Sequence, residues 1–142
     1  MKVYIASDHA GYELKAAIKQ HFTNGFEWED FGTHTSESVD YPDFAHPLAE
    51  AIAADSAAKG VLICGTGNGV AITANKHANV RAALSWNRDI AALARQHNDA
   101  NVLVLPARFI SVEDAFDLVE TFFNTPFEGG RHERRVNKIN CR

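Results

Sequence analysis

The chain has 142 residues, of which 46% are hydrophobic and 23% are charged, and its formal net charge is -4. This length suits one domain over residues 1–142, with a core large enough to cover a sheet on both faces. An acidic chain has no general attraction to nucleic acid or acidic membranes, so neither is an expected partner and any anion site must be a local basic cluster.

The N-terminal apolar run Val3–Ala6 is too short for the core of a signal peptide, and no stretch of the sequence is long enough to span a membrane. Two cysteines, Cys64 and Cys141, do not make a disulfide framework. These features predict a cytoplasmic protein.

Short apolar runs alternate with segments of helical spacing along the chain. In chain order they predict a strand at 3–6, a helix at 11–22, a strand at 28–31, a helix at 42–54 with an irregular first turn at Pro47, a strand at 61–64, a helix at 70–78, a strand at 81–85, a helix at 88–97, a strand at 102–105, a helix at 112–123 capped by Ser111, and a last helix at 130–139. Parallel strands need crossover helices, so we expect a Rossmann-like three-layer α/β/α sandwich with a five-stranded parallel sheet in the order 2-1-3-4-5.

That strand order places ligands beyond the carboxyl ends of the first and third strands, next to Ser7–Gly11 and Cys64–Gly69. The glycines of Gly65–Gly69 allow close approach to a ligand, and the following helix offers free N–H groups. Because Val70 replaces a further glycine, an anion or oxyanion site fits better than a dinucleotide cradle, with a plain tight turn as the alternative. Cys64 is a candidate base or nucleophile, and an inert buried thiol is the competing interpretation.

Other candidate ligand-binding residues lie along the rest of the chain. Asp8 suits a hydrogen-bond acceptor for the ligand, and His9 suits a hydrogen-bond donor to a phosphate, although Asp8 could instead cap the next helix. His97 stands at a helix end, where capping competes with catalysis. Arg131 and Arg135 share a helical face that suits a phosphate, unless it is simply a solvated basic face. The remaining histidines have no zinc-like spacing and predict no metal site: His21, His34, His46, His77 and His132.

In order and spacing, seven segments of the chain resemble the ribose-5-phosphate isomerase B family, which also contains the galactose-6-phosphate isomerase subunits. They run from the first strand to the last helix, so the resemblance covers nearly the whole chain. The segments are Ser7–Gly11, Asp40–Pro42, Ile63–Gly69, Ala74–Lys76, Arg81–Ala83, Arg95–Leu103 and Glu128–His132.

The resemblance implies an aldose–ketose isomerase that interconverts D-ribose 5-phosphate and D-ribulose 5-phosphate through an enediolate, in the pentose phosphate pathway. It assigns ring opening to His97 and Asp8, and proton transfer between carbons 2 and 1 to Cys64, because the acidic base of the family's other branch is replaced by Val70. Thr66 and the loop N–H groups would stabilise the oxyanion. The implied sugar and phosphate contacts are His9, Tyr41, Gly65, Gly67, Asn68, Gly69, Asn98, Arg108, Arg131 and Arg135.

The resemblance further implies a homodimer or tetramer whose site lies at an interface, with Arg108 reaching the phosphate from the neighbour and the last helix, 130–139, at the dimer contact. No metal or organic cofactor is implied. Competing functions are isomerisation of allose 6-phosphate, a tetrulose 4-phosphate or galactose 6-phosphate, or a non-catalytic sugar-phosphate sensor on the same fold. A sensor would need the arginines but not Cys64.

Overall fold

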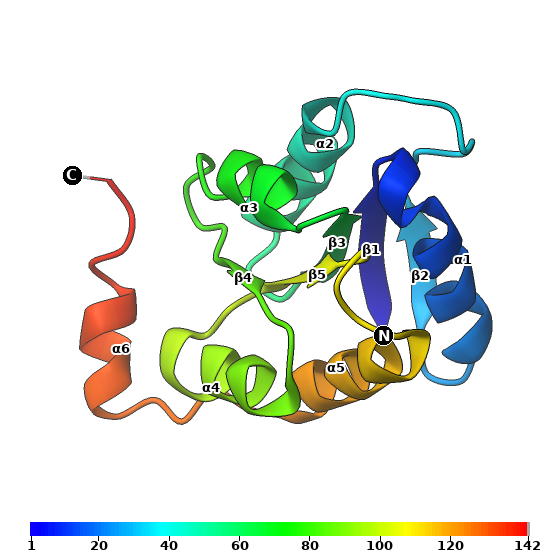
Figure 1. The fold of residues 1–142 in the computed structure, drawn as a ribbon. Coiled ribbons are helices and arrows are strands. Elements are labelled where there is room, and N and C mark those ends of the chain that lie inside the picture. The colour runs from blue at the N-terminus through cyan, green and yellow to red at the C-terminus, as the bar shows by residue number, and fades with distance from the viewer. Residues whose placement is uncertain (142) are drawn as a thin grey trace.

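A computed structural model describes residues 1–141 (Figure 1). Strands and helices alternate through these residues as the sequence predicts, with a 3₁₀ turn at the start of the first helical segment. In chain order the elements are β1 (Lys2–Ser7), the 3₁₀ helix His9–Gly11, α1 (Tyr12–His21), β2 (Glu27–Asp30), α2 (Pro42–Ala53), β3 (Lys59–Cys64), α3 (Asn68–Ala74), β4 (Ala82–Leu84), α4 (Arg88–Asn98), β5 (Val102–Pro106), α5 (Val112–Asn124) and α6 (Arg131–Val136).

The five strands form one parallel sheet in the order β2-β1-β3-β5-β4. The parallel α/β fold is confirmed, but the predicted order 2-1-3-4-5 is wrong, because β5 lies between β3 and β4. The burial of the two strands explains the difference. Every residue of β5 is buried, whereas the three residues of β4 are only half-buried and suit an edge.

Helices cover both faces of the sheet, with α2 and α3 on one side and α1, α4 and α5 on the other (Figure 1). Successive residues of β3 alternate between two cores. Val61 and Ile63 belong to the cluster under α1, α4 and α5, and Leu62 and Cys64 belong to the cluster under α2 and α3. The side chain of Cys64 is therefore held in the α2–α3 layer.

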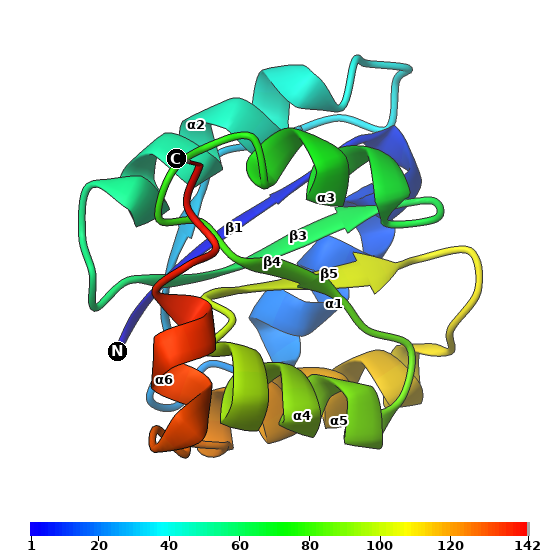
Figure 2. The ribbon, with the colours of Figure 1, turned by 90° about the vertical axis from the view of Figure 1, so that its left-hand side faces the viewer.

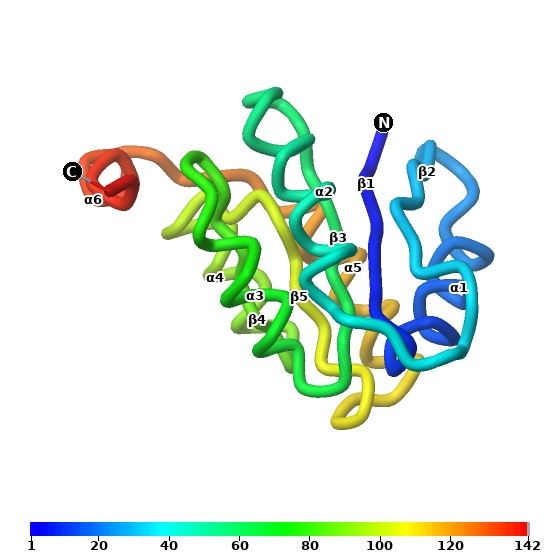
Figure 3. The backbone as a smooth tube through the Cα atoms, turned by 90° about the horizontal axis from the view of Figure 1, so that it is seen from above, coloured from blue at the N-terminus to red at the C-terminus, as the bar shows by residue number. Residues whose placement is uncertain are grey.

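Helix α6 packs on α4 and stands apart from the two main layers (Figure 3). It is shorter than the predicted 130–139, since the helix ends at Val136 and the following chain turns toward the loop after α3. There the side chain of Asn140 accepts a hydrogen bond from the Asn79 N–H (2.9 Å) and donates one to the Asn79 side chain (2.7 Å). These bonds hold the C-terminal segment against the body of the protein.

Smaller sequence predictions are also decided by the structure. Ser111 caps α5, with its Oγ accepting a hydrogen bond from the Asp114 N–H (3.0 Å), as predicted. Pro47 lies inside α2, which begins at Pro42, and α3 ends at Ala74 rather than at residue 78. Among residues 1–141, no helix has the length and apolar character needed to cross a membrane.

Candidate active site

The loops that follow β1, β3 and β5 meet at the carboxyl edge of the sheet, as the sequence predicts. Backbone hydrogen bonds tie them together. The Asp8 N–H donates to the Ile63 carbonyl (3.2 Å), the Ala107 N–H to the Cys64 carbonyl (2.9 Å), and the Arg108 N–H to the Gly65 carbonyl (3.0 Å). Asp8, Cys64 and Arg108 therefore sit on one bonded framework, although they come from distant parts of the chain.

The glycine-rich loop after Cys64 has little room for side chains. Gly67 adopts φ +79°, a left-handed conformation that favours glycine, and leads directly into α3. The ring of Tyr41 lies so close to Gly69 that an added Cβ would stand 2.7 Å from Cε1 of the tyrosine. The loop is thus tightly packed, with exposed Thr66 accepting a hydrogen bond from the Asn68 N–H (3.2 Å). Cys64 lies at its base with 4% of its surface exposed.

Asp8 and His9 are both oriented by backbone groups. One oxygen of Asp8 accepts a hydrogen bond from the Gly11 N–H (3.2 Å), so its predicted alternative role as a helix cap is confirmed. The Val39 N–H donates to Nδ1 of His9 (3.2 Å). That bond makes Nδ1 an acceptor, so the neutral imidazole carries its proton on Nε2 and can donate it to an anion.

A buried ionic cluster that the sequence analysis missed supports the segment before α2. The ammonium of Lys15, 3% exposed, donates to Asp30 (2.8 Å) and to the Thr33 carbonyl, and Lys19 donates to the other Asp30 oxygen (3.0 Å). Burial lowers the pKa of Lys15 despite its contact with Asp30. Burial alone would raise the pKa of Asp30, but hydrogen bonds from Lys15, the Gly32 N–H and Lys19 outweigh it and hold that pKa below its usual value.

A second group of candidate residues surrounds a cavity of about 390 Å³ between α4 and α6. It brings together His97 and Asn98 at the end of α4 with the two arginines of α6, Arg131 and Arg135. Arg131 and Arg135 are predicted to share one helical face, and both line this cavity. The side chains of α6 thus add two guanidinium groups to a histidine and an amide, a combination that suits a phosphorylated ligand.

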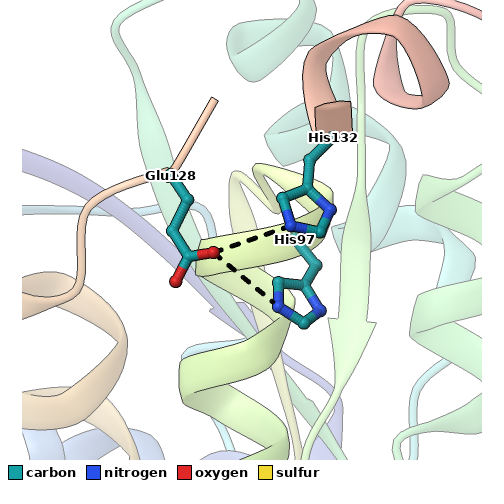
Figure 4. Close-up of side chains that lie close together, drawn as sticks. All are labelled: His97, Glu128 and His132. Atoms are coloured by element: carbon teal, nitrogen blue, oxygen red, sulfur yellow. Dashed lines mark ion pairs between the residues drawn. The ribbon is translucent and has the colours of Figure 1, made fainter. Parts of the chain in front are cut away.

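Two further residues at this cavity were not found from the sequence. His132 stacks on His97, with ring centroids 4.2 Å apart, and Glu128 lies beside both rings (Figure 4). Burial, followed by the positive charge of His97 and of Arg131, lowers the pKa of His132. The spacing of the histidines predicts no metal site, yet the ligand atoms of His97, Glu128 and His132 lie within 4.8 Å of one another.

The two groups of residues lie at opposite ends of the sheet. Strands β3 and β5 pair from Gly60 and Val102 to Cys64 and Pro106, a rise of about 13 Å, and His97 precedes the start of β5. Figure 2 shows α6 at the end of the sheet opposite the tips of β3 and β5. One chain therefore does not bring His97 and Arg131 next to Cys64.

Arg108 belongs to the group at the carboxyl edge. Its Nη1 lies 3.1 Å from the position that a Cβ on Gly65 would occupy, so the guanidinium rests on the glycine-rich loop of its own chain. The resemblance implied that Arg108 comes from a neighbour. The structure instead places Arg108 with Cys64, and places His97, Asn98, Arg131 and Arg135 away from it.

Comparison with known proteins shows which family the chain belongs to. The family model described as Ribose/Galactose Isomerase matches residues 3–139. The chain belongs to this family. The membership predicted from seven short segments is therefore confirmed, and the family match covers both ends of the sheet.

Relatives within the ribose/galactose isomerase family are similar along their whole length. The ribose-5-phosphate isomerase B of Escherichia coli is 42% identical over 139 residues, which cover 97% of this chain and 93% of the relative. A crystal structure of a ribose 5-phosphate isomerase from Thermotoga maritima is 53% identical, has a TM-score of 0.94, and covers 98% of this chain and 97% of its own. The ribose-5-phosphate isomerase B of Mycoplasma genitalium with bound ribulose-5-phosphate is 45% identical, with a TM-score of 0.94 and coverage of 97% and 93%.

Proposed function

We propose that the chain is an aldose–ketose isomerase that interconverts D-ribose 5-phosphate and D-ribulose 5-phosphate, a step of the pentose phosphate pathway. The observation that carries the proposal is the juxtaposition of Cys64, Asp8 and the glycine-rich loop at the carboxyl edge of β1 and β3. The fold around it matches that of a relative described with ribulose-5-phosphate bound. A thiol beside a cluster of backbone N–H groups is suited to moving a proton next to a developing oxyanion.

In the proposed reaction, His97 and Asp8 first open the sugar ring. Cys64, as thiolate, then removes the proton from carbon 2, and the C–H electron pair forms a double bond to carbon 1 while the carbonyl pair moves onto oxygen 1. Thr66 and the loop N–H groups stabilise this enediolate. The Cys64 thiol returns the proton to carbon 1, and the hydroxyl proton of carbon 2 moves to oxygen 1 as the ketone forms.

The remaining candidate residues hold the substrate in this proposal. His9, whose Nε2 proton is left free by the bond from Val39, donates to the phosphate together with Arg131 and Arg135. Tyr41 and Asn98 contact the sugar. Arg108 acts from the chain that supplies Cys64, because its guanidinium rests on Gly65 of the same chain.

The complete site needs two chains, so we place a homodimer in the proposal. A two-fold axis would set the α4–α6 cavity of one copy against the carboxyl edge of the other, with α6 at the contact. The surface between the two groups supports this arrangement. It includes the edge strand β4 and the apolar side chain of Ile72, which is 63% exposed beside a groove of about 450 Å³ lined also by Leu84.

The proposed base also bears on where the enzyme works. Cys64 and Cys141 are both free thiols, and Cys64 must stay reduced to act as a base. A cytoplasmic location is part of the proposal because that compartment keeps thiols reduced.

Proton NMR in deuterium oxide tests the reaction directly. Wild type should convert ribose 5-phosphate to the ketose with deuterium entering at carbon 1 of the ketose, and at carbon 2 of aldose re-formed by the reverse reaction. Cys64→Ala should lower the rate by about 10²- to 10⁴-fold. Cys141→Ala, which removes the other, exposed thiol, is the matched control and should behave as wild type. Conversion that survives in Cys64→Ala would reject Cys64 as the base. Absence of conversion by wild type would reject ribose 5-phosphate as substrate, and binding without turnover would favour a sensor.

A further inference from the structure

Two imidazole rings and one carboxylate meet where α4, the connector 125–130 and α6 converge (Figure 4). The rings of His97 and His132 are stacked, with centroids 4.2 Å apart and planes 12° from parallel. Both Nε2 atoms face the same oxygen of Glu128, His132 at 3.6 Å and His97 at 3.9 Å. A single negative charge is therefore shared between two stacked rings.

The connector that carries Glu128 is fixed at both ends. The Glu128 N–H donates to the Gln96 carbonyl (3.1 Å), one residue before His97. The buried guanidinium of Arg95 donates to the Thr125 carbonyl (3.1 Å), and the His132 N–H donates to the Gly129 carbonyl (3.1 Å). The carboxylate is thus presented to the rings from an anchored backbone.

One carboxylate can neutralise one imidazolium, and two stacked imidazolium rings would repel each other. The charged and titratable groups that face the pair are Glu128 from the connector and Arg131 and Arg135 from α6, while Arg95 of α4 is turned toward Asp99 and Thr125. Burial and these positive charges lower the pKa of His132, whose side chain is 10% exposed. His97 is 41% exposed and lies against both the ring of His132 and the Glu128 carboxylate.

The orientation of the rings also argues against a metal centre. Imidazole binds a metal through a lone pair in the plane of its ring. Because the two planes are 12° from parallel and the centroids are 4.2 Å apart, an ion on the lone pair of one ring would lie well out of the plane of the other. The cluster suits a proton better than an ion.

We infer that Glu128 and His132 are positioning residues that fix the ring of His97, the histidine that opens the sugar ring in the proposed function. The inference rests on the proposed function. His97 gives its proton to the ring oxygen as the bond from that oxygen to carbon 1 breaks and its electron pair stays on the oxygen. Asp8 takes the proton of the carbon 1 hydroxyl, whose O–H pair completes the aldehyde.

The two sugars of the proposed reaction allow ring opening to be measured separately from proton transfer at carbon. Ribose 5-phosphate closes to a furanose through its carbon 4 hydroxyl and must be opened. Ribulose 5-phosphate stays open, because the carbon 5 hydroxyl that would close a five-membered ring on its ketone carries the phosphate. Exchange of the carbon 1 proton of ribulose 5-phosphate with deuterium oxide therefore reports on proton transfer at carbon without ring opening.

Glu128→Gln tests the inference, since its side chain is 51% exposed and the substitution keeps its shape. The variant should lower kcat/KM for ribose 5-phosphate by about 10- to 100-fold, a part of what general acid catalysis contributes, while exchange on ribulose 5-phosphate stays within about 2-fold. His132→Asn should give the same split between the two sugars.

Glu133→Gln, which removes an exposed carboxylate of α6, is the matched control and should change neither rate. Equal losses on both sugars in Glu128→Gln would show a merely structural role and overturn the inference, as would unchanged rates on both. Wild type that neither converts ribose 5-phosphate nor exchanges ribulose 5-phosphate would overturn the proposed function itself. Cys64→Ala should lose both readouts, a pattern distinct from that of Glu128→Gln.

Discussion

Replacing Gly67 with alanine tests why the loop beside Cys64 contains glycine. Gly67 has φ +79°, and a Cβ there would lie 2.4 Å from Cδ1 of Leu84 and 3.2 Å from Cγ1 of Val104. The substitution therefore combines two independent costs. One is the left-handed backbone, which L side chains rarely adopt, and the other is a collision with β4 and β5.

The structure allows the two costs to be separated. A left-handed non-glycine residue costs about 1–2 kcal/mol, and forcing a methyl group into packed surroundings costs about 1–3 kcal/mol more. Gly25 is the matched control, because its φ is +82° and an added Cβ would have nothing within 4 Å. Gly25→Ala should show only the first cost, so the difference between the two variants measures the collision.

Urea unfolding at neutral pH gives both values as changes in the free energy of unfolding. Leu84→Ala, which removes the colliding atom, should cost less in the Gly67→Ala background than in wild type. Gly67→Ala should also lower kcat/KM, because the loop N–H groups move with the backbone. A Gly67→Ala variant no less stable than Gly25→Ala, or a Leu84→Ala change that is simply additive, would refute the argument that packing fixes this loop.

Three further predictions address other parts of the chain. Asp30→Asn leaves buried Lys15 unpaired and should lower the free energy of unfolding by about 3 kcal/mol. Since the folded pKa of Asp30 lies below its unfolded value of 3.8, the stability it contributes is present above that value, and urea titrations should show the deficit fading as pH falls through the folded pKa. Ser111→Ala should cost about 1 kcal/mol by the same assay, through loss of the cap on α5. Mixing inactive Cys64→Ala and His97→Ala should restore about one quarter of wild-type turnover, because half of randomly paired dimers then hold one intact site; no recovery after subunit exchange would contradict a shared site.

The sequence predicts the alternation of elements well, and its one topological error has a physical origin. Strands predicted at 81–85 and 102–105 are both short and apolar, and pattern alone does not say which one pairs with β3. The composition of the two segments does indicate which strand lies at the edge of the sheet. Arg81 at the start of the weaker run suits an edge, whereas Val102–Leu105 has no polar residue and suits a position covered on both faces.

The carboxyl-edge group was predictable because chain order alone places Asp8 and Cys64 at the ends of neighbouring parallel strands. The contacts of Glu128 with His97 and of Lys15 with Asp30 arise from packing between separate segments, which spacing does not encode. The position of Lys15 in the sequence does indicate a buried ion pair. Lys15 lies next to Leu14 on the buried side of α1, where a lysine requires a partner.

Dividing the proposed site between two edges of the fold has an energetic consequence. The phosphate does not react, but its binding to Arg131 and Arg135 supplies binding free energy. That energy can lower the barrier to proton transfer at carbon 2 only when Cys64 of another copy lies next to the same sugar. A separate chain would keep the cavity between α4 and α6 and would still bind a phosphate there. Turnover per chain should therefore fall on dilution below the dissociation constant of the dimer. The affinity of each chain for inorganic phosphate should fall less, because only the contributions of His9 and Arg108 from the partner are lost while Arg131 and Arg135 remain.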